Sequence, residues 1–280
     1  MAACLKTNPD PEPETKDPAD MIVNHENIKL SDIPAQYISQ AKSTLHIAYE
    51  HTSHGSQITD GMSGLSVWKG STYAWNDGGT GGALDINDYG ITGGTDLGNP
   101  NYTAWEASTR TYLNKPENSN VNVVMWSWCG EVSSASETNI SNYLSLMAGL
   151  EHDYPSVKFV YMTGHLDGSG LTGNLHLRNE QIRNYCKTNN KILFDFEDIE
   201  SYDPDGVYYG NKIPTDACDY DSNNDGVRDS NWATAWQNSH TVGTDWYNCS
   251  SAHSQPVNAN MKAYAAWYLW ARLAGWDGNL

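Results

Sequence analysis

The feature that most constrains the fold is a regular alternation of short apolar runs with longer segments of helical periodicity. Four apolar runs occupy residues 45–50, 122–127, 157–162 and 191–196. Apolar residues recur at helical spacing in 33–41, 105–113, 140–150, 175–186 and 258–275. Near-continuous apolar runs are typical of strands buried on both faces. Because such strands alternate with helices, the sequence predicts an α/β fold with a central parallel sheet covered on both sides.

Three polar segments lie outside this pattern. Residues 5–20 contain four of the eleven prolines and many charges, so we expect residues 1–25 to form a disordered tether. Residues 56–102 are rich in Gly, Asn and Asp, and we expect them to be mostly loop. Residues 203–248 form a long polar excursion. The sequence therefore predicts one domain over residues 26–280, with an insertion around 203–248.

Charge and terminal residues limit the partners and the compartment. The formal net charge is −18, whereas a nucleic-acid-binding protein needs a basic surface, so we expect no nucleic-acid partner. No run reaches the roughly 18 apolar residues of a membrane span. The start Met1-Ala2-Ala3-Cys4 resembles the trimmed end of a bacterial lipoprotein signal. We expect lipidation of Cys4 and an extracellular, periplasmic or cell-surface location; the alternative is a chance cysteine in a tail.

Four further cysteines allow three disulfide pairings. We favour a Cys218–Cys249 bridge, because both residues flank the same polar insertion. Cys129 and Cys186 are then expected to be buried free thiols.

The best nucleophile candidate follows the first apolar run. Ser53 stands in the segment His51-Thr52-Ser53-His54-Gly55, where a strand is expected to turn into a helix. A serine at such a turn exposes its hydroxyl at the carboxyl edge of the sheet, and nearby N–H groups can hold an oxyanion. The alternative is a simple helix cap. His253 precedes the final helix and can reach the same edge, which favours the catalytic interpretation.

These blocks resemble those of the SGNH (GDSL-type) hydrolase superfamily over residues 44–276. The Gly-Asp-Ser block of that family corresponds here to the His-x-Ser-x-Gly turn around Ser53, and its Asp-x-x-His block corresponds to Ser250-x-x-His253. The third block, Gly-x-Asn-Asp, aligns with residues 128–131, which lack the oxyanion-hole asparagine. The resemblance implies a flavodoxin-like three-layer α/β/α fold and ester hydrolysis.

The resemblance also implies roles for individual residues. Ser53 would attack an ester carbonyl while His253 takes its proton, so we expect their side chains to lie within hydrogen-bond reach. Asp245 is the nearest upstream carboxylate that could orient His253, although a dyad without an acid is also possible. Oxyanion donors would be the backbone N–H groups of Ser53, Gly93 or Gly94, and Gly130.

The sequence suggests two kinds of metal site. His51, His54 and His165 follow expected strands and could instead bind zinc, but their spacing matches no strong motif. The second site resembles an isolated calcium loop, with oxygen ligands at alternate positions and Gly226 at the sharp turn. Its expected ligands are Asp221, Asn223, Asp225, Val227 and Asp229, and Asp219 or Asp216 could complete the shell. The alternative is a solvated loop of Asx turns. We expect calcium to be structural and catalysis to need no cofactor.

Two functions follow from these observations. The first is a secreted serine esterase that removes acyl groups from carbohydrate. The second is a catalytically inactive scaffold of the same fold that binds carbohydrate. Eleven Trp and seventeen Tyr against three Phe suit sugar binding, since these rings combine an apolar face with a polar tip.

Overall fold

The computed structural model describes residues 21–95, 98, 101–128 and 130–279, and its centre is an all-parallel sheet. The seven strands are β1 (Ile22–Val23), β2 (His46–His51), β3 (Trp75–Asn76), β4 (Leu84–Asp88), β5 (Val123–Ser127), β6 (Lys158–Met162) and β7 (Ile192–Phe194). The four apolar runs became β2, β5, β6 and β7. The predicted parallel sheet is therefore confirmed.

The strand order explains where a site can form. It runs β1-β7-β6-β5-β2-β4-β3. If β2 is counted first and the two-residue edge strands β1 and β3 are omitted, the order is the flavodoxin-like 2-1-3-4-5. The direction of winding reverses between β2 and β5. Ligand sites in such sheets lie at the carboxyl ends of the strands beside this reversal.

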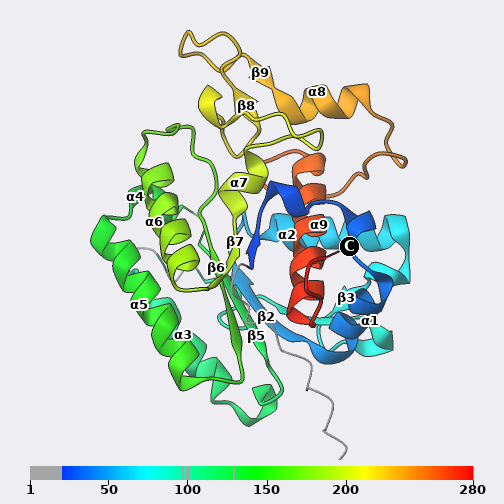
Figure 1. Cartoon of the computed structure of the whole chain (residues 1–280), viewed down its shortest axis with the longest axis vertical. Coiled ribbons are helices and arrows are strands. Elements are labelled where there is room, and N and C mark those ends of the chain that lie inside the picture. Colours follow the sequence, from blue (N-terminus) through cyan, green and yellow to red (C-terminus); the bar gives the residue numbers. More distant parts are fainter. Residues whose placement is uncertain (1–20, 96–97, 99–100, 129, 280) are drawn as a thin grey trace, which may run out of the picture.

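Helices cover both faces of the sheet (Figure 1). The helices are α1 (Ala35–Thr44), α2 (Ser56–Lys69), α3 (Ala104–Leu113), α4 (Glu131–Ser134), α5 (Glu137–Asp153), α6 (Asn174–Thr188), α7 (Phe196–Glu200), α8 (Trp232–Ser239) and α9 (Pro256–Leu273). One layer holds α1, α2 and α9, and the opposite layer holds α3, α5 and α6. This arrangement confirms the three-layer α/β/α architecture.

Successive side chains of a strand point to opposite faces of the sheet, so the core consists of two clusters, one on each face. In β2, Ile47 and Tyr49 pack in the cluster beneath α9, whereas Ala48 packs in the cluster beneath α5. The helix α9 is buried along nearly its whole length, including the side chain of Lys262. A helix that is apolar on most sides belongs in the interior of a layer, and α9 holds that place between α1 and α2.

The expectation that residues 56–102 are mostly loop is wrong at its start, because residues 56–69 form α2. Two glycines within α2, Gly61 and Gly64, gave this segment the composition of a loop. In the structure both glycines lie in tight contact with neighbouring segments, where a side chain would not fit. A Cβ added to Gly61 would lie 2.1 Å from the carbonyl oxygen of Ala259 in α9. Only glycine allows the two helices to approach so closely.

The domain begins earlier than expected. Ile22 and Val23, assigned to the tether, form β1 and pair with β7. Residues 1–20 of the predicted tether, with Cys4, lie outside the described residues. The 203–248 segment includes an antiparallel pair, β8 (Asp219–Tyr220) with β9 (Ser230–Asn231), and the helix α8. In Figure 1 this segment (yellow to orange) lies beyond the sheet, on the side of α7.

The expected Cys218–Cys249 disulfide is absent from the part of the chain that the structure describes. The Sγ atom of Cys218 lies 3.3 Å from the Ser254 hydroxyl, and the Sγ atom of Cys249 lies 3.4 Å from Nδ2 of Asn260. Each thiol therefore has its own polar neighbour. Cys186 is a buried free thiol, as predicted, and Cys129 lies outside the described residues.

Within the described ranges, no helix combines the length and the apolar character that crossing a bilayer requires.

Candidate functional site

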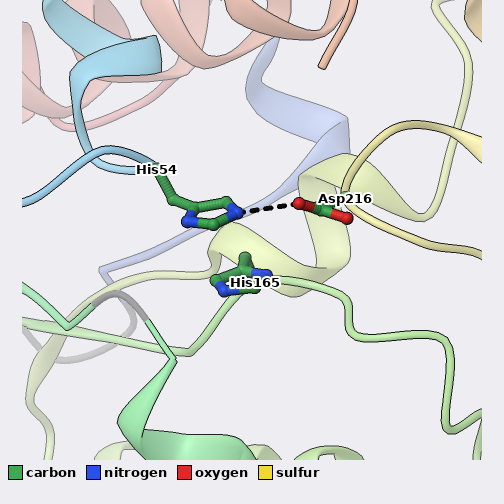
Figure 2. A group of neighbouring side chains, drawn as sticks. All are labelled: His54, His165 and Asp216. Carbon is green, nitrogen blue, oxygen red and sulfur yellow. Dashed lines mark hydrogen bonds and ion pairs between the residues drawn. The ribbon is translucent and has the colours of Figure 1, made fainter. Parts of the chain in front are cut away.

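Three histidines and an aspartate from separate parts of the chain meet at the carboxyl edge of the sheet. His54 lies in the turn between β2 and α2, and His165 lies three residues after the end of β6. Asp216 comes from the polar 203–248 segment, and His253 precedes α9. Figure 2 shows the His54 ring next to the Asp216 carboxylate, with the ring of His165 below it. The site therefore combines residues that lie up to about two hundred positions apart in sequence.

An ion pair fixes the ring of His54. Its Nε2 atom lies 2.8 Å from Oδ2 of Asp216. Burial raises the pKa of the Asp216 carboxyl, but the hydrogen bond from His54 and the charges of His165 and His54 lower it by more, so the net pKa lies below its usual range. The carboxylate is thus ionised at neutral pH, and Nε2 of His54 must donate the hydrogen. An acid that holds an imidazole in this way fixes its tautomer and stabilises its protonated form.

The other two histidines stack on His54. The ring centroid of His165 lies 3.6 Å from that of His54, with 3° between the planes. His253 lies at 4.5 Å and 17°. His165 Nδ1 lies 2.9 Å from the backbone oxygen of Leu166, so in the neutral ring Nδ1 donates and Nε2 keeps the lone pair. His253 is exposed to solvent and has a positive φ of 60°, an uncommon backbone conformation for a residue other than glycine.

The close packing of α2 on α9 positions the loops that carry the histidines. Gln57, in the first turn of α2, donates from Nε2 to the backbone oxygen of Ala252 at 2.5 Å, which ties the His253 loop to the His54 turn. The buried Lys262 of α9 donates to Oε1 of Gln57 and lies 3.4 Å from the Glu200 carboxylate. Burial raises the pKa of Glu200 and lowers that of Lys262, in each case against the effect of the partner's charge.

Ser53 lies where the sequence predicted, in the turn that leads from β2 into α2, and it is half-buried. Its carbonyl oxygen accepts hydrogen bonds from the N–H and the hydroxyl of Ser56. His253 reaches the same edge, because its ring contacts His54, the next residue after Ser53. The direct approach of the Ser53 and His253 side chains stays a prediction.

Asp245 does not contact His253 in the described ranges. It is exposed, and its Oδ2 accepts a hydrogen bond at 2.8 Å from the N–H of Thr241, which closes a local turn. The acid of the histidine cluster is instead Asp216. Proximity in sequence suggested Asp245, whereas the folding of the 203–248 segment brings Asp216 to the site.

The expected oxyanion donors at Gly93 and Gly94 are engaged elsewhere. The N–H of Gly93 donates to the carbonyl oxygen of Tyr89 at 2.9 Å, and the N–H of Gly94 donates to the carboxylate of Glu50 at 2.8 Å. Glu50 is fully buried in β2 and also accepts from the N–H groups of Ile91 and Thr92. A buried carboxylate needs such donors, so this loop binds Glu50 in place of an oxyanion. Gly130 is exposed just before α4, and a Cβ there would meet no atom within 4 Å.

The zinc alternative includes one residue that lies elsewhere. His51 pairs with Asp88 at 2.8 Å and packs between Tyr49 and Tyr89. The remaining residues His54 and His165, with Asp216, offer ligand atoms within 4.8 Å of one another. However, a metal ion lies close to the plane of each imidazole that binds it, at about 2.0–2.1 Å. Two parallel rings stacked 3.6 Å apart cannot share such an ion without rotation of one ring.

The predicted calcium loop folds as a series of turns around Asp221. The Asp221 carboxylate accepts backbone N–H groups, the closest from Asn224 and Gly226 at 2.7 Å each. The side chains of Asn223 and Asp225 each accept a hydrogen bond from the N–H of the second residue after them. The Asp229 carboxylate accepts from the N–H and the hydroxyl of Ser222. Burial raises the pKa of the Asp221 carboxyl, but the hydrogen bonds that it accepts from backbone N–H groups lower it by more. The net pKa lies below its usual range. Calcium binding by this loop stays a prediction.

Sequence reasoning missed the central acid of the site. The sequence suggests Asp216 only as an additional calcium ligand, because no spacing relates it to His54, 162 residues earlier. Of the three histidines that the sequence suggests as alternative zinc ligands, His54 and His165 belong to the cluster and His51 does not. No protein-family model matches this chain, and comparison with curated proteins and with solved structures yields no significant match.

Proposed function

We propose that this protein is a serine ester hydrolase that removes acyl groups from carbohydrate, with Ser53 as nucleophile and His253 as general base. One observation carries the proposal: rings from three loops stack beside Ser53 at the carboxyl edge of the sheet, and Asp216 fixes the central ring, His54. Such an edge, beside the reversal of strand order, is where α/β sheets place their chemistry. The sugar substrate follows from the sequence resemblance and the Trp and Tyr content.

The proposed reaction has two steps. Ser53 Oγ attacks the ester carbonyl while His253 accepts the hydroxyl proton, and the tetrahedral intermediate then expels the alcohol, which takes the proton from His253. Water next attacks the acyl-serine, with His253 again accepting and returning a proton, and releases the carboxylic acid. The positive charge that develops on His253 lies next to the His54–Asp216 pair, whose carboxylate stabilises it electrostatically.

The test is a panel of chromogenic esters and acetylated oligosaccharides. We expect Ser53→Ala and His253→Ala each to lower kcat/KM by at least ~10³-fold, and the double variant to be little worse, because groups that act as a unit are not additive. Ser63→Ala, an exposed serine of α2, is the matched control and should retain wild-type activity. Hydrolysis that persists in Ser53→Ala would overturn the mechanism. Sensitivity to a zinc-selective chelator would favour a metal-dependent reaction instead.

The second candidate is an inactive scaffold that binds carbohydrate. The observation in its favour is that the N–H groups of Gly93 and Gly94 are already used within the loop that surrounds Glu50. This candidate expects no hydrolysis of any ester in the panel, together with measurable binding of unesterified glycans. Activity that Ser53→Ala abolishes would exclude it.

A further inference from the structure

A cavity of about 390 Å³ lies beside the histidine cluster. Its walls come from the loop that follows His165, from α6 and α7, and from Tyr208 and Pro214 of the 203–248 segment. A water molecule takes about 30 Å³ of liquid, whereas small-molecule sites span roughly 300–1,000 Å³. The cavity is thus far too large for a single ion and has the size of an organic ligand site.

Leu166 links this cavity to the histidine cluster. Leu166 lines the cavity. Its backbone oxygen lies 2.9 Å from Nδ1 of His165 and accepts the N–H of Asp216 at 3.1 Å. The next residue, Asp167, also lines the cavity and pairs with Thr215. The same short segment therefore forms the wall of the cavity and positions two members of the cluster.

The charge of the lining disfavours anionic ligands. Five carboxylates line the cavity against three basic side chains, those of Arg183, Lys187 and His176. His176 Nδ1 lies 3.1 Å from Oε1 of Glu197, and this hydrogen bond raises the pKa of the imidazole. The Arg183 guanidinium is held by carboxylates: it donates to both oxygens of Asp195 at 2.6 and 2.7 Å and to Glu180 at 2.8 Å, and it pairs with Glu197 at 2.8 Å. The excess of carboxylates repels acidic groups and offers acceptors for hydroxyl or ammonium donors.

The cavity also presents an aromatic face. Tyr208 is 40% exposed, and its ring lies 4.9 Å from that of Tyr202, which stacks on His25 at 3.5 Å. Tyrosine combines a flat apolar face with a polar tip. A sugar ring matches this lining, since it has C–H groups on its faces and hydroxyls around its edge.

We infer that this cavity is a subsite for a sugar unit that carries no acidic group, and that it selects against uronic-acid, sulfated or phosphorylated sugars. The inference rests on the proposed function for identifying that sugar as the part of the substrate next to the ester. The ester would lie at Ser53 and the sugar beyond Leu166. Binding energy from this non-reacting part would position the ester for attack.

Binding is measured on the Ser53→Ala protein, so that hydrolysis plays no part. Isothermal titration compares neutral xylo-, manno- and cello-oligosaccharides and chitosan oligomers with oligogalacturonate of equal length. We expect at least one non-acidic oligosaccharide to bind, and oligogalacturonate to bind at least tenfold more weakly. Adding Tyr208→Ala should weaken binding at least fivefold. Tyr89→Ala, at a tyrosine of similar exposure outside the cavity, is the matched control and should leave binding unchanged.

The inference is overturned if none of the oligosaccharides binds, if oligogalacturonate binds as tightly as the neutral ones, or if Tyr208→Ala binds like its parent. A charge reversal tests the selectivity separately. Asp167→Lys should improve oligogalacturonate binding, whereas Asp77→Lys, an exposed aspartate outside the cavity, should not. Failure of hydrolysis in the ester panel leaves this binding result intact, so the two proposals fail independently.

Discussion

At the site, the hydrogen bond from His54 stabilises the negative charge of the Asp216 carboxylate at the carboxyl edge of the sheet. The Asp216 side chain is three-quarters buried, yet the carboxylate stays ionised because His54 donates to it. Nearby, Glu200 and Lys262 are buried almost completely. The histidine cluster therefore lies between solvent and a buried pair of opposite charges.

We predict that Asp216→Asn lowers the free energy of unfolding by about 1.5–3 kcal/mol at pH 7, the usual range for a hydrogen bond to a charged group. The pKa of Asp216 is lowered in the folded state, so the stabilisation is present above the unfolded-state pKa of about 3.9 and is lost as the pH falls through the folded-state value. Urea denaturation at pH 7, 5 and 3 checks this expectation.

In these experiments the difference between wild type and Asp216→Asn should be similar at pH 7 and 5 and should shrink at pH 3. Asp245→Asn, an exposed aspartate of the same segment, is the control and should differ little from wild type at any pH. A difference that grows at pH 3 would contradict the assignment of an ionised Asp216.

At the scale of elements, the contact between α2 and α9 determines how the site is assembled. The turn before α2 carries Ser53 and His54, and the loop before α9 carries His253. These two helices make the most extensive contact between helices in the described structure. Gly61 of α2 allows that approach, and the hydrogen bond from Gln57 to Ala252 joins the start of α2 to the loop before α9.

We predict that Gly61→Ala destabilises the protein by about 1–3 kcal/mol, the usual cost of overpacking a core. The added methyl group would lie 2.1 Å from a backbone oxygen of α9, which cannot rotate away as a side chain can. Gly149→Ala in α5 is the matched control, because its Cβ would meet only Arg110 Nη2 at 3.7 Å. That control should be stabilised by about 0.5–1 kcal/mol, since alanine favours a helix over glycine. Urea denaturation of both variants distinguishes the two cases, and equal effects would contradict the packing role of Gly61.

At the scale of the whole molecule, the 203–248 segment extends over the carboxyl edge of the sheet. It supplies Asp216 to the histidine cluster and Tyr208 and Pro214 to the cavity. Asp216 donates its N–H to Leu166, and Arg228 donates to the backbone oxygens of Ile213 and Gly168. The loop predicted to bind calcium lies in this same segment, between β8 and β9.

We predict that calcium raises the melting temperature of the whole domain and that a chelator lowers it, because a ligand that binds only the native state stabilises by RT ln(1 + [L]/Kd). Asp225→Ala should lower the melting temperature without chelator and should remove its dependence on calcium. Since Asp225 also accepts the N–H of Val227, part of that loss is independent of calcium. The decisive measurement is thus the difference between calcium and chelator within each variant. Identical melting curves for wild type in both conditions would refute the site.

The sequence by itself determined the class of fold and the place of the candidate nucleophile. Strand and helix periodicity are local properties, because each depends on which face of one segment is buried. Four strands and five helices were recognised in this way. Ser53 was placed at the carboxyl end of β2, since a turn residue follows directly from the strand before it. The helix α2 was missed because Gly61 reflects contact with α9 and Gly64 reflects contact with Tyr247 and Cys249, which local composition does not reveal.

Only the tertiary structure decided which residues surround that serine. Asp216 replaced Asp245 as the acid next to a histidine, and Glu50 took the N–H of Gly94 that was expected to face an oxyanion. The stack of His54, His165 and His253 depends on the order β6-β5-β2 and on the packing of α9, and no spacing in the sequence encodes it. Hydrogen bonds and ring contacts between distant segments form only after the apolar faces have packed, so residue pairs of this kind are specified by the whole fold.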